Sequence, residues 1–223
     1  MKTTVDNKKR VLIVDDHPLF RVGLGRIIDQ QDDMVVCAEA SDGPGGLMAV
    51  GKHKPDAVVV DISLEKGSGL DLIKDIHAQF EALPILALSV HHENLYAERA
   101  IHAGAKGYVM KRASNESLLA ALRKVLGGQV AVSEEIVSRL IERRSHAKTK
   151  DLPCEPDQLL SDRELEVFRL IGQGEGTRQI AAKLGVAKST VESYRASIKQ
   201  KMGLANGPTL VTRAAAYMAQ ESG

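Results

Sequence analysis

Four short apolar runs of this chain each lead into polar side chains that are suited to phosphate chemistry. The polar residues that end or follow these runs are Asp15, Asp16, Asp61, Ser89 and Lys111. Three carboxylates in one cleft repel one another, and at least one pKa rises unless a cation neutralises them. A hard divalent cation such as Mg²⁺ prefers carboxylates, waters and phosphate oxygens. With a hydroxyl and an ammonium to hold phosphate oxygens, the set predicts phosphoryl-group chemistry.

The elements that position these residues follow from hydrophobic patterning. Apolar runs alternate with amphipathic stretches five times, which predicts an α/β fold, a doubly wound five-stranded parallel sheet. Strands are expected near residues 10–15, 34–40, 57–61, 84–89 and 107–111. Helices are expected near residues 18–30, 43–53, 68–79, 93–103 and 114–127. Because all strands of a parallel sheet end at one edge, the polar residues should share one cleft.

The rest of the chain is predicted to be helical. Residues 8–128 are expected to form the α/β domain, and residues 129–157 a linker with a short helix from 133 to 144. Residues 158–221 are expected to form a small all-α domain. In it, a short helix near 177–184, a turn containing Gly185 and a longer helix starting near Lys188 form the pattern of a helix-turn-helix.

Composition limits the classes of function only weakly. The chain has 223 residues, 43% of them hydrophobic and 3% aromatic, which permits two small aliphatic cores. The formal net charge of +1 names no partner. No secretory apolar segment and no run of membrane-spanning length are recognisable, so we expect a cytoplasmic protein without a membrane partner.

The first half resembles the receiver domain of two-component response regulators, a flavodoxin-like fold. The match rests on the acidic pair and on the Asp, Ser and Lys named above; the segments Asp16-His17-Pro18 and Gly104 to Tyr108 resemble the NarL/FixJ group. The resemblance implies a phospho-acceptor role for Asp61. It implies Mg²⁺ as cofactor, held by Asp15, Asp16, Asp61 and the backbone of Ser63. It further implies phosphate-binding or switch roles for Ser89, Tyr108 and Lys111. One departure is Glu65, where the family usually has Pro.

The second half resembles a LuxR-type helix-turn-helix. The segments that carry this resemblance are Leu160 to Val167, Gln179-Ile180-Ala181 and Ser189 to Tyr194. The expected DNA contacts are Lys188, Ser189, Glu192, Ser193, Arg195, Lys199 and Arg178. Glu192 has two interpretations: it could accept a hydrogen bond from cytosine, or pair with Ser189 in a capping box that only stabilises the helix start.

The last helix, near residues 208–218, has two readings as well. Leu210, Ala214 and Tyr217 recur at helical spacing and are assigned to dimerisation, although the same spacing also suits a small core. By resemblance, the exposed side of this helix pairs two DNA-binding domains on a two-fold operator.

The combined resemblance implies a regulator rather than an enzyme, apart from Mg-dependent self-phosphorylation and slow self-dephosphorylation. The expected partners are a sensor histidine kinase, double-stranded DNA and a second copy of the chain after phosphorylation, with RNA polymerase as a further candidate. Three rival hypotheses are a phosphate-independent regulator, a metal-dependent phosphatase and a nucleotide-binding α/β domain. The last lacks support because Asp-Asp-His-Pro, not a glycine-rich loop, follows the first strand.

Overall fold

The computed structural model describes residues 8–64, 68–90, 93–138 and 156–221. The chain divides into two compact units, residues 1–148 and residues 149–223. Among the described residues, no helix is long and apolar enough to cross a membrane. Glu65 lies outside the described residues, so the consequence of this departure from the family pattern stays open.

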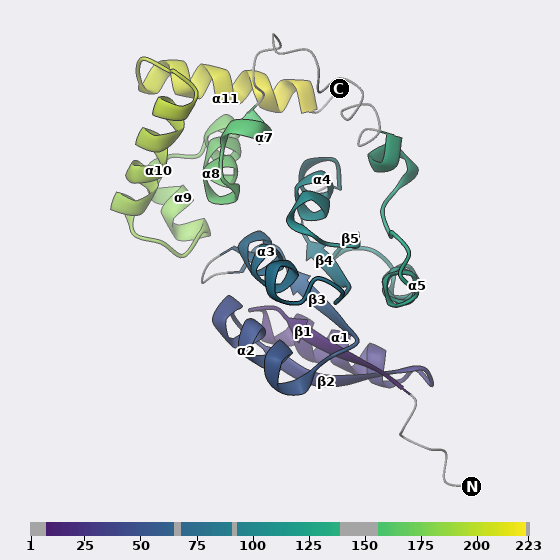
Figure 1. Cartoon of the computed structure of the whole chain (residues 1–223). Helices are drawn as coiled ribbons and strands as arrows, with labels where there is room; N and C mark the ends of the chain where they lie inside the picture. Colours follow the sequence, from purple (N-terminus) through teal and green to yellow (C-terminus); the bar gives the residue numbers. More distant parts are fainter. Residues whose placement is uncertain (1–7, 65–67, 91–92, 139–155, 222–223) are drawn as a thin grey trace, which may run out of the picture. The chain divides into compact units, whose positions relative to one another are not determined.

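The first unit is an all-parallel sheet with the strand order β2-β1-β3-β4-β5 (Figure 1). The strands are β1 (Lys9–Val14), β2 (Met34–Ala40), β3 (Ala57–Asp61), β4 (Ile85–Ser89) and β5 (Gly107–Met110). The helices are α1 (Pro18–Asp29), α2 (Gly43–His53), α3 (Gly69–Gln79), α4 (Glu93–Ala103) and α5 (Asn115–Leu126). The alternation of strand and helix predicted from the sequence is therefore confirmed.

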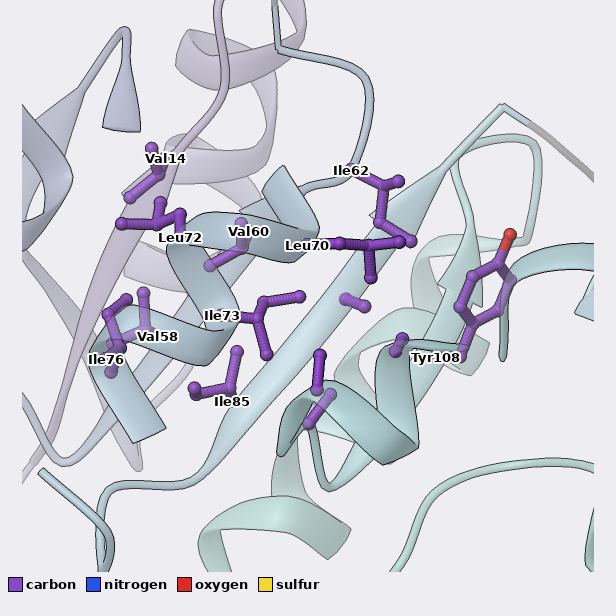
Figure 2. Close-up of a cluster of buried hydrophobic side chains, with 14 of the residues drawn as sticks. Val14, Val58, Val60, Ile62, Leu70, Leu72, Ile73, Ile76, Ile85 and Tyr108 are labelled. Carbon is purple, nitrogen blue, oxygen red and sulfur yellow. The ribbon is translucent and has the colours of Figure 1, made fainter. Parts of the chain in front are cut away.

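Two aliphatic cores lie on opposite faces of this sheet. The first lies between the sheet and helices α2, α3 and α4, and Figure 2 shows part of it. The second lies between the sheet and helices α1 and α5. Strands β3 and β4 are buried along their whole length, because helices cover both faces of a parallel sheet.

Local sequence signals explain most of the helix starts. Pro18 is the first residue of α1, where its missing N–H is tolerated. The Asp42 side chain caps α2 by accepting a hydrogen bond from the Gly45 N–H. Ser68 is the N-cap residue of α3, but its side chain makes no capping hydrogen bond.

The segment after α5 differs from the linker predicted for residues 129–157. The Ala131 N–H donates to the Lys106 carbonyl, and the Tyr108 N–H donates to the Ala131 carbonyl, both at 2.9 Å. Residues 134–138 are helical, and Ile136 is 1% exposed within the first core. The first ten residues of the predicted linker are therefore part of the α/β unit; the rest of the predicted helix lies outside the described residues.

The second unit is a small helical bundle, shown in green to yellow in Figure 1. Its helices are α7 (Pro156–Leu159), α8 (Asp162–Gly172), α9 (Thr177–Lys183), α10 (Lys188–Lys201) and α11 (Gly207–Glu221). One buried cluster, which includes Phe168, Ile180 and Ile198, joins these helices. The short turn between α9 and α10 gives the helix-turn-helix arrangement that the sequence predicts.

Candidate functional site

The carboxyl edge of the first unit's sheet brings the predicted acidic residues together. Asp15 follows β1, and Asp61 ends the neighbouring strand β3; their side chains are 0% and 1% exposed. Ligand atoms of Asp15, Asp16, His17 and Asp61 all lie within 4.8 Å of one another. The parallel sheet therefore forms the predicted acidic cluster.

Lys111 enters this cluster from the end of β5. Its ammonium nitrogen lies 2.7 Å from Asp15 Oδ2 and 2.7 Å from Asp61 Oδ2. The ammonium also lies 4.6 Å from the ring centre of Phe20, which shields one side of the cation. One positive charge is thus shared by two buried carboxylates.

Burial and neighbouring charges act on the Asp61 carboxyl in opposite directions. Burial raises the pKa of Asp61 above its usual value because it removes water from the charged form. The Lys111 ammonium opposes this rise, whereas the nearby Asp15 carboxylate adds to it. The Ser63 N–H donates to Asp61 Oδ1 at 3.0 Å and also favours the ionised form. The ionised form of Asp61 therefore depends on positive charge in the cleft.

Gly69 allows the start of helix α3 to lie directly against the backbone of Asp61. A Cβ atom at Gly69 would lie 1.9 Å from the Asp61 backbone oxygen. The Gly69 N–H donates to the Ile62 carbonyl at 3.0 Å, so helix α3 begins directly against the end of β3. No larger residue fits there without moving the backbone that carries Asp61.

The predicted switch residues lie on the next two strands. Ser89 ends β4, one residue beyond the strand partner of Asp61, and is fully buried. The Ser89 carbonyl accepts a hydrogen bond from the Lys111 N–H at 2.7 Å. Tyr108 is 4% exposed and lies at one end of the first core, with its hydroxyl pointing away from the labelled aliphatic side chains (Figure 2). The Tyr108 ring is therefore already buried in this structure.

His17, directly after the acidic pair, suits by its sequence position either a metal ligand or an exposed loop residue. Its side chain is 62% exposed, yet Nδ1 lies 2.7 Å from Asp16 Oδ1 and 3.3 Å from Asp15 Oδ1. The His17 N–H also donates to Asp15 Oδ1 at 2.8 Å. Its place directly after the acidic pair was the only available signal, and such a position also suits an exposed loop residue.

The donor set of the cluster fits a hard divalent cation. Asp15, Asp16 and Asp61 offer carboxylate oxygens at the mutual distances given above, and two of the three side chains are almost fully buried. Buried carboxylates at this spacing repel one another unless a positive charge lies among them. In this structure the Lys111 ammonium supplies one such charge.

The predicted DNA contacts of the second unit differ in the exposure of their side chains. Lys188, Ser189, Glu192 and Ser193 are exposed on α10. The Ser193 hydroxyl donates to the Ser189 carbonyl within the helix.

The three other predicted DNA contacts differ in how far their side chains are exposed. Arg195 and Lys199 are half-buried on α10, and Arg178 is exposed on α9. Helix α10 begins at Lys188 with Ala187 as its N-cap, so the capping-box interpretation of Ser189 and Glu192 is wrong. The exposed Glu192 carboxylate remains available for DNA contact.

Glu164 forms a buried polar network, of which the sequence indicates only the capping box with Ser161. Its carboxylate accepts hydrogen bonds from the Ser161 N–H at 2.7 Å, the Ser197 hydroxyl at 2.6 Å and the Lys201 ammonium at 2.6 Å. The Ser197 and Lys201 side chains thereby hold α10 against the start of α8.

The assignment of Leu210, Ala214 and Tyr217 to dimerisation is wrong. These side chains are 0%, 0% and 8% exposed and pack into the core of the second unit. The Tyr217 ring lies 5.7 Å from that of Phe168, centre to centre. Helical spacing identified the apolar face of α11 correctly, but that face completes the fold of its own chain.

A flavodoxin-like sheet with an acidic cluster and a lysine at its carboxyl edge, joined to a helix-turn-helix unit, defines the class of response regulators. The chain belongs to the response regulator receiver domain family, which it matches over residues 11–123. Residues 158–214 match the luxR family of bacterial regulatory proteins. The protein is therefore a transcriptional response regulator with a LuxR-type DNA-binding domain.

Relatives and solved structures agree with this membership. The chain is 37% identical to the oxygen regulatory protein NreC of Staphylococcus haemolyticus, over 91% of this chain and 94% of that protein. It is 36% identical to NreC of Staphylococcus aureus strain JH9 over the same shares.

Among solved structures, the response regulator ChrA of a heme-sensing two-component system is 32% identical, with a TM-score of 0.50; the match covers 96% of this chain and 98% of ChrA. Promoter-bound RcsB of Salmonella enterica serovar Typhimurium is 27% identical, with a TM-score of 0.58; that match covers 94% of this chain and 99% of RcsB.

Proposed function

We propose that this response regulator accepts a phosphoryl group on Asp61 and thereby controls DNA binding by its helix-turn-helix unit. The observation that carries the proposal is the position of the Asp61 carboxylate. It is buried at the end of a central strand and lies 2.7 Å from the Lys111 ammonium. Asp15 and Asp16 surround it, and Ser89 lies on the neighbouring strand.

The side chains of the cleft have separate tasks in the transfer. Asp61 Oδ attacks the phosphorus of the donor, so that an O–P bond forms while the bond between phosphorus and the donor breaks. Lys111 holds an oxygen of the transferred group, and the Ser89 hydroxyl donates a hydrogen bond to another. The Ser63 N–H orients Asp61 through its hydrogen bond to Oδ1.

Asp15, Asp16, Asp61 and the Ser63 backbone carbonyl would hold Mg²⁺. Held by these residues, the cation would neutralise phosphoryl oxygens and offset the repulsion between the carboxylates. The self-catalysed gain and slow loss of the phosphoryl group are the only reactions that we assign to the chain.

The receiver domain implies a sensor histidine kinase as phosphoryl donor, and the LuxR-type domain implies double-stranded DNA as target. The promoter complexes and DNA-bound dimers of RcsB support DNA binding by a homodimer of this chain. RNA polymerase is a further partner that transcriptional control would need. Because DNA and the kinase's phosphoryl donor group must both be reached, we place the protein in the cytoplasm.

For the DNA contacts, we assign reading of base edges to the exposed residues of α10. Lys188, Ser189, Glu192 and Ser193 have the exposure that such a role requires. Arg195, Lys199 and Arg178 are assigned to phosphate contacts, which position the domain without carrying sequence information.

Intact mass measurement tests the phosphorylation directly. Mg²⁺ and a small-molecule phosphodonor are added to wild type, to Asp61→Asn and to the control Asp71→Asn, whose carboxylate is exposed on α3. We expect a gain of one phosphoryl group in wild type and in the control, and none in Asp61→Asn. Omitting Mg²⁺ should abolish the gain. Wild-type protein that stays at its original mass with every donor would refute the proposal and favour a phosphate-independent regulator.

A further inference from the structure

The segment that follows α5 covers the open edge of the sheet beside the switch tyrosine. Strand β5 is the last strand of the sheet, and its outer side would otherwise present unpaired backbone groups. Residues 129–138, here called the docked segment, lie along this edge and form a parallel bridge between Gly107 and Ala131. The two hydrogen bonds of Ala131, to Lys106 and Tyr108, enclose Gly107.

The close approach at this bridge depends on a glycine. A Cβ atom at Gly107 would lie 2.9 Å from the Ala131 Cβ and 2.9 Å from Leu86 Cδ1. The sequence of β5 is therefore compatible with a partner at this distance only because residue 107 has no side chain. This fit indicates that the docked segment is a built part of the receiver fold.

One hydrogen bond and one shared buried cluster join the docked segment to helix α4. The Ser133 N–H donates to Glu93 Oε1 at 2.7 Å, at the start of that helix. The Ser133 hydroxyl accepts a hydrogen bond from the Ile136 N–H at 3.3 Å and begins the helical turn 134–138. Ile136 is 1% exposed and belongs to the same buried cluster as Tyr96 and Tyr108.

A short series of contacts connects this segment with the acidic cleft. Asp61 pairs with Lys111, whose N–H bonds to the Ser89 carbonyl. Lys111 follows β5 directly, and Tyr108, three residues earlier on that strand, donates its N–H to Ala131. A shift of β5 or of the Tyr108 ring therefore changes the surface on which the docked segment lies.

We propose that the docked segment is the output element of the receiver: it is held on β5 and α4 in the unphosphorylated chain and is released when Asp61 is phosphorylated. The inference rests on the proposed function. Release frees residues 129–138 for the connection to the DNA-binding unit, and so changes how far that unit can move from the receiver. Docking and phosphorylation are then linked, and weakening one favours the other.

Hydrogen exchange of the full-length chain, with and without Mg²⁺ and a phosphodonor, tests the release. In wild type, we expect the amides of residues 129–138 to exchange at least about tenfold faster after phosphorylation. Ile136→Ala should show fast exchange of this segment without phosphodonor. The matched control is Val137→Ala, because Val137 is the next residue of the same helical turn and is 41% exposed; it should behave like wild type.

A binding measurement tests the same linkage in the opposite direction, from release of the docked segment to the acidic cleft. Ile136→Ala should bind beryllium trifluoride, a phosphoryl analogue, about fivefold or more tightly than wild type in the presence of Mg²⁺. Unchanged protection of β1 and α1 peptides would show that the variant remains folded. If these peptides lose protection, the variant is not properly folded. The proposal is then tested by the exchange of residues 129–138 in wild type, compared with and without Mg²⁺ and phosphodonor.

The intact mass of the same samples separates the two possible failures. A phosphoryl gain without faster exchange of residues 129–138 would overturn the release mechanism and leave the proposed function intact. Absence of a phosphoryl gain in wild type would overturn the proposed function, and the release mechanism with it.

Discussion

At the scale of single residues, Lys111 shows how a receiver cleft is held together before phosphorylation. Its ammonium lies at equal distance from the Asp15 and Asp61 carboxylates and offsets part of the repulsion between them. A bound divalent cation would take over this task, which leaves Lys111 free to hold the incoming phosphoryl oxygens. We therefore propose that the same side chain stabilises the resting cleft and serves the transfer.

The sequence was sufficient to predict this set of residues, because each of them ends or follows an apolar strand. It left His17 open between a metal ligand and an exposed loop residue, and it indicated only the capping contact of Glu164 with Ser161. Glu164 bonds to Ser197 and Lys201, more than thirty positions away, and only the packing of α8 against α10 brings them together. Local spacing contains no signal for such a contact.

The Glu164 network makes the stability of the second unit dependent on pH. Burial raises the pKa of Glu164, but the hydrogen bonds from Lys201, Ser197 and Ser161 outweigh it and hold the pKa at about 2. Because the folded-state pKa is depressed, this contribution to stability is complete above the ordinary value of 4.5 and is lost as the pH falls toward about 2. Glu164→Gln should therefore cost about 2 kcal/mol at pH 7 and progressively less below pH 4.5.

Hydrogen exchange of α8 and α10 peptides in the full-length chain measures this loss. Lys201 is 42% exposed, so solvent screening reduces its share of the effect. The matched control is Glu166→Gln, which removes the nearby half-buried pair with Arg163 and should cost less. Equal exchange of wild type and Glu164→Gln at pH 7 would contradict this account.

At the scale of elements, helix α11 and the segment after α5 mark the limits of prediction by periodicity. Spacing located the apolar face of α11 but could not show whether it meets its own core or a second chain. It also gave no sign that residues 129–132 add to the sheet edge, because a single bridge is too short to produce an alternating pattern. Both answers depend on tertiary contacts.

Because the apolar face of α11 is buried in its own core, we propose that this helix pairs two chains through its exposed side. Val211 is 42% exposed there, next to the buried Leu210. Val211→Asp should weaken self-association of the phosphorylated chain by at least about tenfold, because it puts a charge into an apolar contact. It should leave the fold intact, whereas Leu210→Ala should cost about 2–5 kcal/mol of stability.

Sedimentation velocity, together with thermal unfolding of each variant, separates these two effects. Ala182→Asp, at an exposed position of α9, is the control for added charge and should dimerise like wild type. If Val211→Asp dimerises as strongly as wild type, the contact lies elsewhere on the chain.

At the scale of the whole molecule, the protein joins a cleft for phosphoryl transfer to a domain for DNA binding. The two compact units have separate cores, so each can keep its fold while the connection between them changes. Control of DNA binding by phosphorylation must therefore pass through the surface of the receiver, through the connecting residues, or through pairing of two chains. The docked segment and α11 are the elements that we assign to this task.

The central claim is that phosphorylation of Asp61 controls sequence-specific DNA binding. The most direct measurement is selection from a pool of random-sequence DNA duplexes by the full-length chain, with and without Mg²⁺ and phosphodonor, for wild type and Asp61→Asn. We expect a common sequence to be enriched only by phosphorylated wild type, with two-fold symmetry if a dimer binds. Equal enrichment of that sequence by untreated wild type or by Asp61→Asn would contradict the account.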